Sequence, residues 1–353
     1  MPDQKLACII LAAGQSKRMK SSHSKALHEI CGKPLLCHVV DTLNKLQPER
    51  IVAVVSPETP DVVDLAGKIG IDTCYQHERL GTGHAALQAE ELLGDFDGTI
   101  LLTCVDIPLL RLETLTALRE VHESNQSAAT ILTAEYDDPT GYGRIVRAES
   151  GTVTAIVEHR DADEATLAVR EINSSVYCFR GRMMFELTKQ VGTANDQGEM
   201  YLTDVISLMV DRGERVDAVI ADDPAEIMGI NNRVQLAEAE GLLRNRIRER
   251  LMLDGVSMVD PATTYVDDGV RIGRDTTIWP GAVIRGSTTI GEGCEIGPHA
   301  QIIDSTIGDG VLVKQGSQII ESEVGAEASV GPFAHIRPEC VIGPGARAGS
   351  YIE

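Results

Sequence analysis

The C-terminal part of the chain carries an aliphatic residue at every sixth position. The unbroken run comprises Ile272, Ile278, Ile284, Ile290, Ile296 and Ile302. The phase then slips twice, and the repeat continues as far as Ile342. A six-residue period fits neither an α-helix nor an alternating hairpin sheet. It is typical of a left-handed parallel β-helix, in which each hexad forms one flat side and three hexads complete a triangular coil. We therefore predict such a β-helix over residues 255–353, with the aliphatic side chains pointing inward.

Residues 1–229 have a different pattern, in which strand-like runs rich in Val, Ile and Thr alternate with helix-like segments. The runs are 6–12, 50–56, 98–104, 127–136, 152–159, 173–179 and 216–221. Such alternation predicts an α/β domain with a mostly parallel, Rossmann-like sheet. Ligands of these sheets bind beyond the carboxyl ends of the strands. Between the two parts, residues 230–254 read as one amphipathic linker helix.

Composition limits the classes of partner. The 353-residue chain has a formal net charge of -21 and only 3% aromatic residues. An acidic surface argues against nucleic acid and anionic membranes, and few aromatic rings argue against stacking platforms for bases. The start reads as a strand and not as a signal peptide, and no apolar run is long enough to span a bilayer. The eight cysteines form no Cys-x-x-Cys pair, so we expect reduced core thiols, no zinc site and a cytoplasmic location.

The segment after the first strand is basic, although the whole chain is acidic. Its cations are Lys17, Arg18, Lys20, Lys25 and Lys33. The loop holds neither a Walker A motif nor a Rossmann G-x-G-x-x-G motif. Backbone N–H groups and cations after a first strand nevertheless suit the phosphates of a nucleotide. A solvated basic face without a ligand is the alternative on this feature alone.

Longer motifs make the chain recognisable. "LAAGQSKRMKSSHSKALHEICGKP" resembles the pattern L-A-A-G-x-G-T-R-M-x-S-x-x-P-K-x-L-H of sugar-phosphate nucleotidyltransferases. Five further stretches narrow the resemblance to the bacterial bifunctional GlmU family. They are "QHERLGTGHA" (76–85), "DDPTGYGRI" (137–145), "VEHRDAD" (157–163), "QGEMYLTD" (197–204) and "GINNRVQLAEAE" (229–240). That family joins an N-acetylglucosamine-1-phosphate uridyltransferase domain to a glucosamine-1-phosphate acetyltransferase domain.

The resemblance implies Mg²⁺-dependent transfer of UMP from UTP to N-acetylglucosamine 1-phosphate, with release of pyrophosphate. The product, UDP-N-acetylglucosamine, serves peptidoglycan and cell wall synthesis. By the match, Arg18 and Lys25 are catalytic and contact the phosphates, and Asp106 and Asn231 bind Mg²⁺. The nucleotide is held by Leu11, Ala12, Ala13, Gly14, Gln76, Gly81 and Thr82. The sugar is held by Gly143, Glu158 and Asn173. Asn231 also lies near the substrate, and Tyr201 and Thr203 occupy supporting positions around the sugar pocket.

Some positions depart from the family pattern. Ser16 and Lys17 replace Gly-Thr, Ser24 replaces a proline, and Val105 and Ser175 replace glycines. We expect these changes to affect rate and nucleotide fit more than the type of reaction. Two alternatives stay open: a nucleotidyltransferase for another sugar 1-phosphate or nucleotide, and a non-catalytic paralogue that binds a UDP-sugar.

In the family, the β-helix continues past the point where this chain ends, at "GARAGSYIE". The resemblance therefore implies a C-terminally truncated member without acetyltransferase activity. Arg337 matches a residue that binds the acetyltransferase substrate. The resemblance also implies a homotrimer assembled through the β-helix.

Overall fold

The computed structural model describes residues 5–14 and 17–353, which divide into two compact units. The first unit holds the described residues up to His28 together with Pro34–Gln235. The second unit holds Glu29–Lys33 together with Leu236–Glu353. Ser16, one of the departures from the family pattern, lies outside the described residues, as does the side chain of Lys17.

One mixed sheet forms the frame of the first unit, with the strand order β11-β7-β10-β6-β1-β4-β5. In chain order these strands are β1 (Leu6–Leu11), β4 (Arg50–Val55), β5 (Asp72–Tyr75), β6 (Thr99–Cys104), β7 (Ala129–Glu135), β10 (Glu171–Arg180) and β11 (Val216–Ile220). The pairs β1–β4, β1–β6, β4–β5 and β7–β11 are parallel. Strand β10 runs antiparallel to both of its neighbours, β6 and β7. The predicted α/β fold with a mostly parallel sheet is confirmed.

Two further strands extend this sheet on one side. β8 (Arg144–Arg147) and β9 (Val153–Val157) form an antiparallel pair, and β8 also bonds to β10. The register between β10 and β7 shifts between Asn173 and Tyr177, and within this bulge Ser175 has a φ of 62°.

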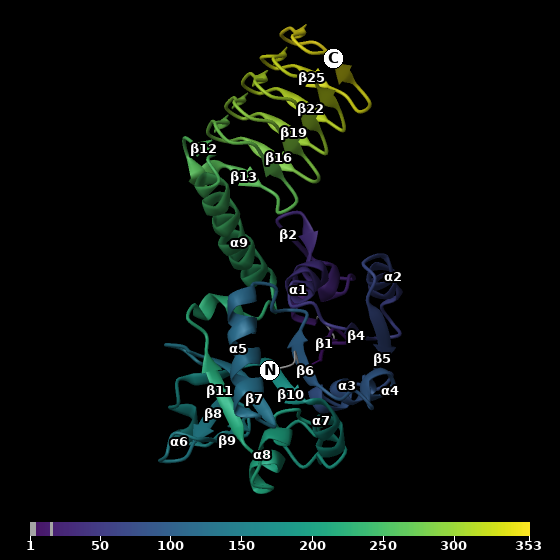
Figure 1. The fold of residues 1–353 in the computed structure, drawn as a ribbon, viewed down its shortest axis with the longest axis vertical. Helices are drawn as coiled ribbons and strands as arrows, with labels where there is room; N and C mark the ends of the chain where they lie inside the picture. The colour runs from purple at the N-terminus through teal and green to yellow at the C-terminus, as the bar shows by residue number, and fades with distance from the viewer. Residues whose placement is uncertain (1–4, 15–16) are drawn as a thin grey trace. The chain divides into compact units, whose positions relative to one another are not determined.

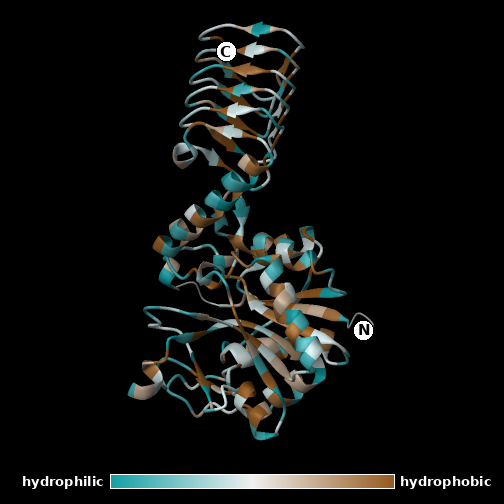
Figure 2. Cartoon of the chain, turned by 60° about the vertical axis from the view of Figure 1, so that its left-hand side comes forward, coloured by the Kyte–Doolittle hydropathy of each residue, from teal (hydrophilic) through white to brown (hydrophobic). Residues whose placement is uncertain are grey.

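Helices cover both faces of the sheet (Figure 1). On one face lie α1 (Leu35–Asn44), α2 (Pro60–Lys68) and α5 (Leu112–Asn125). On the other lie α3 (Thr82–Gln88), α4 (Glu90–Leu93), α7 (Gly181–Thr188) and α8 (Asp204–Asp211), while α6 (Glu164–Leu167) is a short turn without buried residues. Alternate residues of β1 enter opposite cores: Cys8 and Ile10 one, Ala7 and Ile9 the other. Because both faces are buried, this strand is apolar throughout. Figure 2, coloured by hydropathy, shows brown strands within this unit and teal segments on its helices and loops.

The second unit begins with the helix α9 (Arg233–Leu253), whose buried residues include Ala239, Ile247 and Leu251. Three parallel sheets follow. The first contains, in order, β12 (Ser257–Met258), β15 (Thr277–Ile278), β18 (Glu295–Ile296), β21 (Leu312–Val313), β24 (Ser329–Val330) and β27 (Arg347–Ala348). The second contains β13 (Tyr265–Val266), β16 (Val283–Arg285), β19 (Gln301–Ile303), β22 (Gln318–Ile320) and β25 (His335–Ile336). The third contains β14 (Arg271–Ile272), β17 (Thr289–Ile290), β20 (Thr306–Ile307), β23 (Glu323–Val324) and β26 (Val341–Ile342). Most of these strands are two residues long, as in β14 (Arg271–Ile272) and β17 (Thr289–Ile290). The stacked triangular coils, visible in Figure 1, confirm the predicted β-helix.

The register accounts for the two slips in the six-residue repeat. Ile272 pairs with Ile290, Ile290 with Ile307, and Ile307 with Val324, so that coils of eighteen and seventeen residues occur in the stack. Both shortened sides lie at the same corner, between β19 (Gln301–Ile303) and β20 (Thr306–Ile307) and, one coil later, between β22 (Gln318–Ile320) and β23 (Glu323–Val324). Buried serines stack there: the Ser322 N–H donates to Ser305 Oγ at 3.1 Å. The slips are therefore regular corners and leave the coil intact.

A hairpin of β2 (Glu29–Ile30) and β3 (Lys33–Pro34) contributes Glu29–Lys33 to the second unit. The Cys31 N–H donates to Glu240 Oε2 at 2.7 Å, and Lys33 Nζ lies 2.6 Å from Asp268 Oδ2. Lys33 therefore does not belong with the other cations that follow the first strand, contrary to the expectation from sequence proximity.

Among the described residues, none of the helices has both the length and the hydropathy that a membrane crossing requires.

Candidate active site

The carboxyl ends of four neighbouring parallel strands meet at one edge of the sheet. Strands β6, β1, β4 and β5 are adjacent, and they are followed by Asp106, Gly14, Ser56 and Gln76 respectively. Open α/β sheets bind their ligands at this edge, because loops diverge there and leave a crevice. A pocket of about 560 Å³ lies at this position.

The pocket gathers residues that are far apart in the sequence. Every residue predicted to act on the nucleotide, its phosphates or the metal lines it: Leu11, Ala12, Ala13, Gly14, Arg18, Lys25, Gln76, Gly81, Thr82, Asp106 and Asn231. In a chain of net charge -21, the described lining of this pocket therefore combines three cations, Arg18, Lys25 and Arg79, with one predicted metal-binding carboxylate.

Lys25 occupies the centre of the polar part of the pocket. Its Nζ lies 2.8 Å from Asp106 Oδ2 and donates to Asn231 Oδ1 at 3.1 Å. Arg18 donates to the same Asn231 oxygen at 2.9 Å. A carboxylate oxygen and an amide oxygen thus face one cation, with a second cation beside them.

Ser24 explains how this chain keeps Lys25 in place without the proline of the family pattern. Lys25 begins the 3₁₀ turn η2 (Lys25–Leu27), and Ser24 caps this turn by accepting a hydrogen bond from the Ala26 N–H. Ser24 has a φ of -57°, which is close to the value that a proline ring imposes. The serine therefore keeps the backbone conformation and adds a cap.

The donor set around Lys25 suits a magnesium ion. Mg²⁺ prefers hard oxygen ligands and takes only one or two from a protein, since water and phosphate supply the others. Asp106 and Asn231 provide two such oxygens, both within hydrogen-bonding distance of the same ammonium group. Over the described part of the chain, no group of three or more His, Cys, Asp or Glu side chains is placed to hold a metal ion.

A tight turn forms the far end of the pocket. Buried Gln76 donates through Nε2 to the Gly81 carbonyl oxygen at 3.1 Å. Gly81 has a φ of 108°, and a Cβ at this position would lie 2.5 Å from the Met200 carbonyl oxygen. Thr82 Oγ1 accepts a hydrogen bond from the Leu202 N–H at 3.1 Å. The motifs 76–85 and 197–204 are therefore packed together, and only glycine fits at position 81.

Val105 takes a position where the family pattern has glycine. It is 6% exposed, and its side chain packs in the core with Ala12 and Ile107. Its N–H donates to the Leu11 carbonyl oxygen at 3.1 Å, which fixes the backbone between β6 and Asp106. The β-branched side chain also forms part of the pocket lining, so its effect on nucleotide fit stays a prediction.

The five residues predicted to hold the sugar lie together in a second cluster. Thr203 donates to Glu158 Oε1 at 3.1 Å, and the Asn173 N–H donates to the Gly143 carbonyl oxygen at 2.9 Å. Burial raises the pKa of the Glu158 carboxyl, and nearby carboxylates raise it further. Burial likewise raises the pKa of Tyr201. Leu202 lies between Tyr201 and Thr203, so its bond to Thr82 connects this cluster to the nucleotide pocket.

Four pocket residues were not singled out from the sequence. They are Arg79, Ala85, Cys104 and Glu199. Arg79 and Ala85 belong to the quoted motif "QHERLGTGHA", and Glu199 belongs to the quoted motif "QGEMYLTD". The charges of Arg79 and Glu199 inside these motifs were therefore the visible signals. Burial raises the pKa of the Cys104 thiol, which makes this cysteine an unreactive wall of the pocket.

Arg337, predicted from the acetyltransferase half, lies in the second unit just after β25 (His335–Ile336). Its NH1 is 3.4 Å from Glu353 Oε1, and both side chains are exposed. Arg337 takes no part in the pocket of the first unit, whose lining is confined to residues of that unit.

Comparisons with known proteins agree with this arrangement. The model of the MobA-like NTP transferase domain matches residues 8–198. The bifunctional protein GlmU of Streptomyces avermitilis is 47% identical over 351 residues, covering 98% of this chain. The chain belongs to the GlmU family. The GlmU proteins of Brevibacillus brevis and of an Exiguobacterium species are 46% and 48% identical and cover 99% and 98% of the chain.

These matches confirm the recognition from motifs and the predicted enzyme class, a nucleotidyltransferase with UDP-N-acetylglucosamine diphosphorylase activity. The aligned region covers 73%, 75% and 76% of the three GlmU relatives. A second model, the GMPPB C-terminal domain, matches residues 266–351, within the β-helix.

Proposed function

We propose that the first unit transfers UMP from UTP to N-acetylglucosamine 1-phosphate and releases pyrophosphate, with Mg²⁺ as cofactor. The observation that carries the proposal is the placement of Lys25 within reach of both Asp106 and Asn231. The pocket that holds them is connected to the cluster of Glu158 and Asn173 through the hydrogen bond from the Leu202 N–H to Thr82. A nucleotide, a metal and a sugar phosphate would then meet at one point.

The reaction requires that the charges of the phosphates are neutralised and that the attacking oxygen is aligned with the α-phosphorus. An oxygen of the sugar phosphate forms a bond to the α-phosphorus of UTP, and the bond from that phosphorus to the bridging oxygen breaks. The electron pair leaves with pyrophosphate, and no proton has to move. Arg18 and Lys25 hold the α-phosphate and offset its charge in the transition state, where fixed cations contribute most. Mg²⁺, bound by Asp106 and Asn231, supplies further charge neutralisation on the phosphates.

The sugar cluster supports an N-acetylated substrate. Glu158 is half-buried and offers an acceptor to sugar hydroxyls, and Asn173 is 5% exposed. The Asn173 side chain is itself positioned by Tyr177, since Nδ2 donates to the Tyr177 hydroxyl at 2.7 Å. Polar groups fixed in this way discriminate well between substrates, because an analogue without the matching group leaves them unpaired.

The test follows pyrophosphate release with UTP or dTTP and either N-acetylglucosamine 1-phosphate or glucose 1-phosphate. We expect turnover with UTP and the N-acetylated sugar, and its loss in Asp106→Ala and Asn231→Ala. Asp72→Ala is the matched control, because Asp72 pairs with Arg50 on another part of the same sheet. Near-normal turnover in a folded Asp106 or Asn231 variant would show that the replaced residue is not needed to bind Mg²⁺. If the protein turns over another sugar phosphate faster, that compound replaces N-acetylglucosamine 1-phosphate as the proposed substrate.

For the second unit we propose a homotrimer built through the β-helix and no acetyl transfer by residues 255–353. Acetyl transfer to an amine needs a positioned general base. The histidines of this segment are His299 and His335. His299 is a corner residue with a φ of 56°, packed over Gly281. Thiol release from acetyl-CoA with glucosamine 1-phosphate tests this proposal, and sedimentation tests the trimer. The cytoplasmic location likewise stays a proposal.

A further inference from the structure

The two residues proposed to bind Mg²⁺ lie on separate loops of the first unit. Asp106 follows β6, in the loop that leads into α5. Asn231 comes much later in the chain, shortly after the 3₁₀ turn η3 (Pro224–Ile227). A metal that takes only two oxygens from a protein depends on the distance and orientation between them. The two loops must therefore be held in register by groups other than the ligands themselves.

One bond between the loops lies directly beside the ligands. The Ile230 N–H donates to the Asp106 carbonyl oxygen at 2.9 Å. This bond fixes the separation of the two chain segments at one point. A single point of attachment leaves the loops able to turn about it, so a second one is needed to fix their relative orientation.

Glu226 provides the second attachment. Its side chain is 2% exposed and reaches from η3 to the N-terminus of α5. Its Oε2 accepts hydrogen bonds from the Arg111 N–H at 3.1 Å and from Thr114 Oγ1 at 2.7 Å. Its Oε1 lies 3.4 Å from Arg111 Nε. All three donors belong to the end of the Asp106 loop or to the helix that this loop enters.

The electrostatics of this position make the contact of Glu226 a lasting one. The first N–H groups of a helix lack partners within the helix, and the helix dipole favours a negative charge there. A buried carboxylate without such partners would be strongly destabilising, so Glu226 cannot leave them and stay buried. Asp223 strengthens the attachment, since its Oδ2 lies 2.9 Å from Arg111 NH2. The start of η3 is thus also bound to Arg111.

Apolar packing holds the same two loops together but does not set their register. Ile107, beside Asp106, and Ile227, beside Glu226, are buried in one core with exposures of 3% and 1%. Burial of apolar surface is non-directional, so these contacts allow the loops to slide. Hydrogen bonds depend on distance and angle, and the bonds of Glu226 therefore restrict that movement.

We infer that Glu226 is a positioning residue for the metal site. It holds loop 224–231 against loop 105–111 in the register that brings the side-chain oxygens of Asp106 and Asn231 together, and it touches neither of these side chains itself. This inference rests on the proposed Mg²⁺-dependent uridyl transfer and adds the residue that pre-organises its metal ligands.

Direct metal binding tests the inference without relying on turnover. Mn²⁺ is titrated into the protein with saturating UDP-N-acetylglucosamine, and electron paramagnetic resonance measures the free ion. Glu226→Gln keeps the size of the side chain but turns an NH2 group toward donors. Residues that orient metal ligands typically contribute about ten- to hundredfold to metal affinity. Because Glu226 acts on the loops and not on the ligand side chains, we expect the Kd for Mn²⁺ to rise about tenfold.

The Mg²⁺ dependence of uridyl transfer gives a second readout. Glu226→Gln should need more Mg²⁺ for half-maximal rate, and its kcat should approach the wild-type value at high Mg²⁺, because both ligands are still present. Asp106→Ala should not recover in this way, because it lacks a ligand. The KM for N-acetylglucosamine 1-phosphate should stay unchanged in Glu226→Gln, since the predicted sugar residues lie on other elements.

Thr114→Val is a milder variant of the same attachment. It removes one hydrogen-bond donor to Glu226 and keeps the shape of the side chain. We expect a smaller rise in the Kd for Mn²⁺, about threefold, as for loss of one hydrogen bond. If Glu226→Gln does not fold, Thr114→Val decides the question.

Glu123→Gln provides a matched control. Glu123 lies near the other end of α5, where its Oε1 accepts hydrogen bonds from Arg119 Nε at 2.6 Å and from Thr99 Oγ1 at 3.4 Å. Its partners are thus an arginine and a threonine, as for Glu226. Thr99 begins β6, so this contact lies at the opposite edge of the sheet from Asp106. The variant should leave the Kd for Mn²⁺ unchanged.

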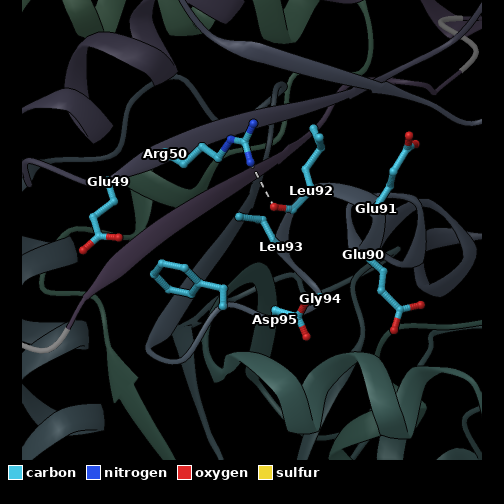
Figure 3. Close-up of a pocket in the computed structure, with 9 residues that line it drawn as sticks. Glu49, Arg50, Glu90, Glu91, Leu92, Leu93, Gly94 and Asp95 are labelled. Atoms are coloured by element: carbon cyan, nitrogen blue, oxygen red, sulfur yellow. Dashed lines mark hydrogen bonds between the residues drawn. The ribbon is translucent and has the colours of Figure 1, made fainter.

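A second control addresses weak binding of Mn²⁺ to other carboxylates. A hollow of the first unit is lined by Glu49, Glu90, Glu91 and Asp95, among other residues (Figure 3). Glu91→Gln removes one of these charges. It should leave the Mn²⁺ titration as it is, whereas Asp106→Ala should abolish the binding that the titration measures.

Each outcome bears on one statement. A wild-type Kd for Mn²⁺ in a folded Glu226→Gln protein, or in Thr114→Val where the first variant does not fold, overturns the inference. An equal rise in Glu123→Gln also overturns it, because loss of stability alone would then weaken the metal site. Thermal denaturation shows whether each variant is folded. If the wild type binds no Mn²⁺, or if Asp106→Ala binds it equally well, the proposed metal site itself fails.

Discussion

Gly81→Ala is the change for which the structure gives the clearest expected magnitude. Gly81 has a φ of 108° and a ψ of 179°, a region of backbone space open essentially to glycine alone. A methyl group there would also lie 2.5 Å from the Met200 carbonyl oxygen and 2.9 Å from the Met200 nitrogen. Both neighbours are backbone atoms, so the contact cannot be relieved by a side-chain rotation.

The backbone strain alone costs about 1–3 kcal/mol. For a unit of this size, each kcal/mol lowers the melting temperature by about 2–4 °C. The backbone strain therefore predicts a fall of about 2–12 °C in the melting temperature, and the steric contact adds to this fall. The predicted contacts of Gln76 and Gly81 with the nucleotide should suffer as well, because the Gly81 carbonyl oxygen accepts the hydrogen bond from Gln76 Nε2. The KM for UTP should rise more than the KM for the sugar phosphate.

The assay is thermal unfolding together with steady-state kinetics for both substrates. Gly67→Ala is the control: Gly67 lies within α2, a Cβ added there would meet nothing within 4 Å, and its φ is not positive. Alanine in a helix is more favourable than glycine, so this control should be neutral or slightly stabilising. A Gly81→Ala protein with wild-type melting temperature and wild-type KM for UTP would refute the steric argument.

Three further predictions follow from single sites. Lys25→Ala should lower kcat more than it raises either KM, with a loss of about 2–4 kcal/mol in transition-state stabilisation, and steady-state kinetics measures that split. Ser175→Gly should raise the free energy of unfolding by about 1 kcal/mol in a denaturant titration, because Ser175 holds a φ of 62° that glycine adopts without strain. Burial and the nearby Arg180 lower the pKa of His122 from 6.5 to about 4, so the folded protein binds fewer protons than the unfolded chain between these values. This contribution to stability is present above pH 6.5 and is lost as the pH falls toward 4, by about 2 kcal/mol between pH 7 and pH 5, and His122→Gln should remove that part of the decline.

The β-helix could be predicted in detail because the six-residue spacing that defines it can be read within a short stretch of sequence. Each hexad places one aliphatic residue inward, and the same spacing recurs in every coil, so counting residues gives the coil. The sequence also located the two slips, after Ile302 and after Ile319. It did not show that the shortened sides stack at one corner, because that follows from the pairing of β19 with β22 and of β20 with β23.

The sequence predicted the class of the sheet in the first unit correctly, but it did not predict the direction of one strand. Its strands could be located from their composition, but the direction of β10 could not, since strand composition is similar in parallel and antiparallel neighbours when both faces are buried. The bulge at Ser175 follows from that direction: it interrupts the pairing with β7 and turns the chain beside Asn173. A serine in a left-handed conformation gives no signal of its own in a single sequence.

The cations after the first strand show where sequence proximity stops being informative. Arg18 and Lys25 reach the pocket, whereas Lys33, eight residues beyond Lys25, pairs with Asp268 in the second unit. Conversely, Arg79 lies 54 residues after Lys25 and shares the pocket with it, because β5 lies two strands from β1 and ends at the same edge. The loops that follow neighbouring parallel strands meet at the carboxyl edge of the sheet. A cation can therefore reach the site when it follows one of these strands, whatever its distance along the sequence. Arg79, which follows β5, meets that condition, whereas Lys33 lies in the hairpin of β2 and β3 and does not.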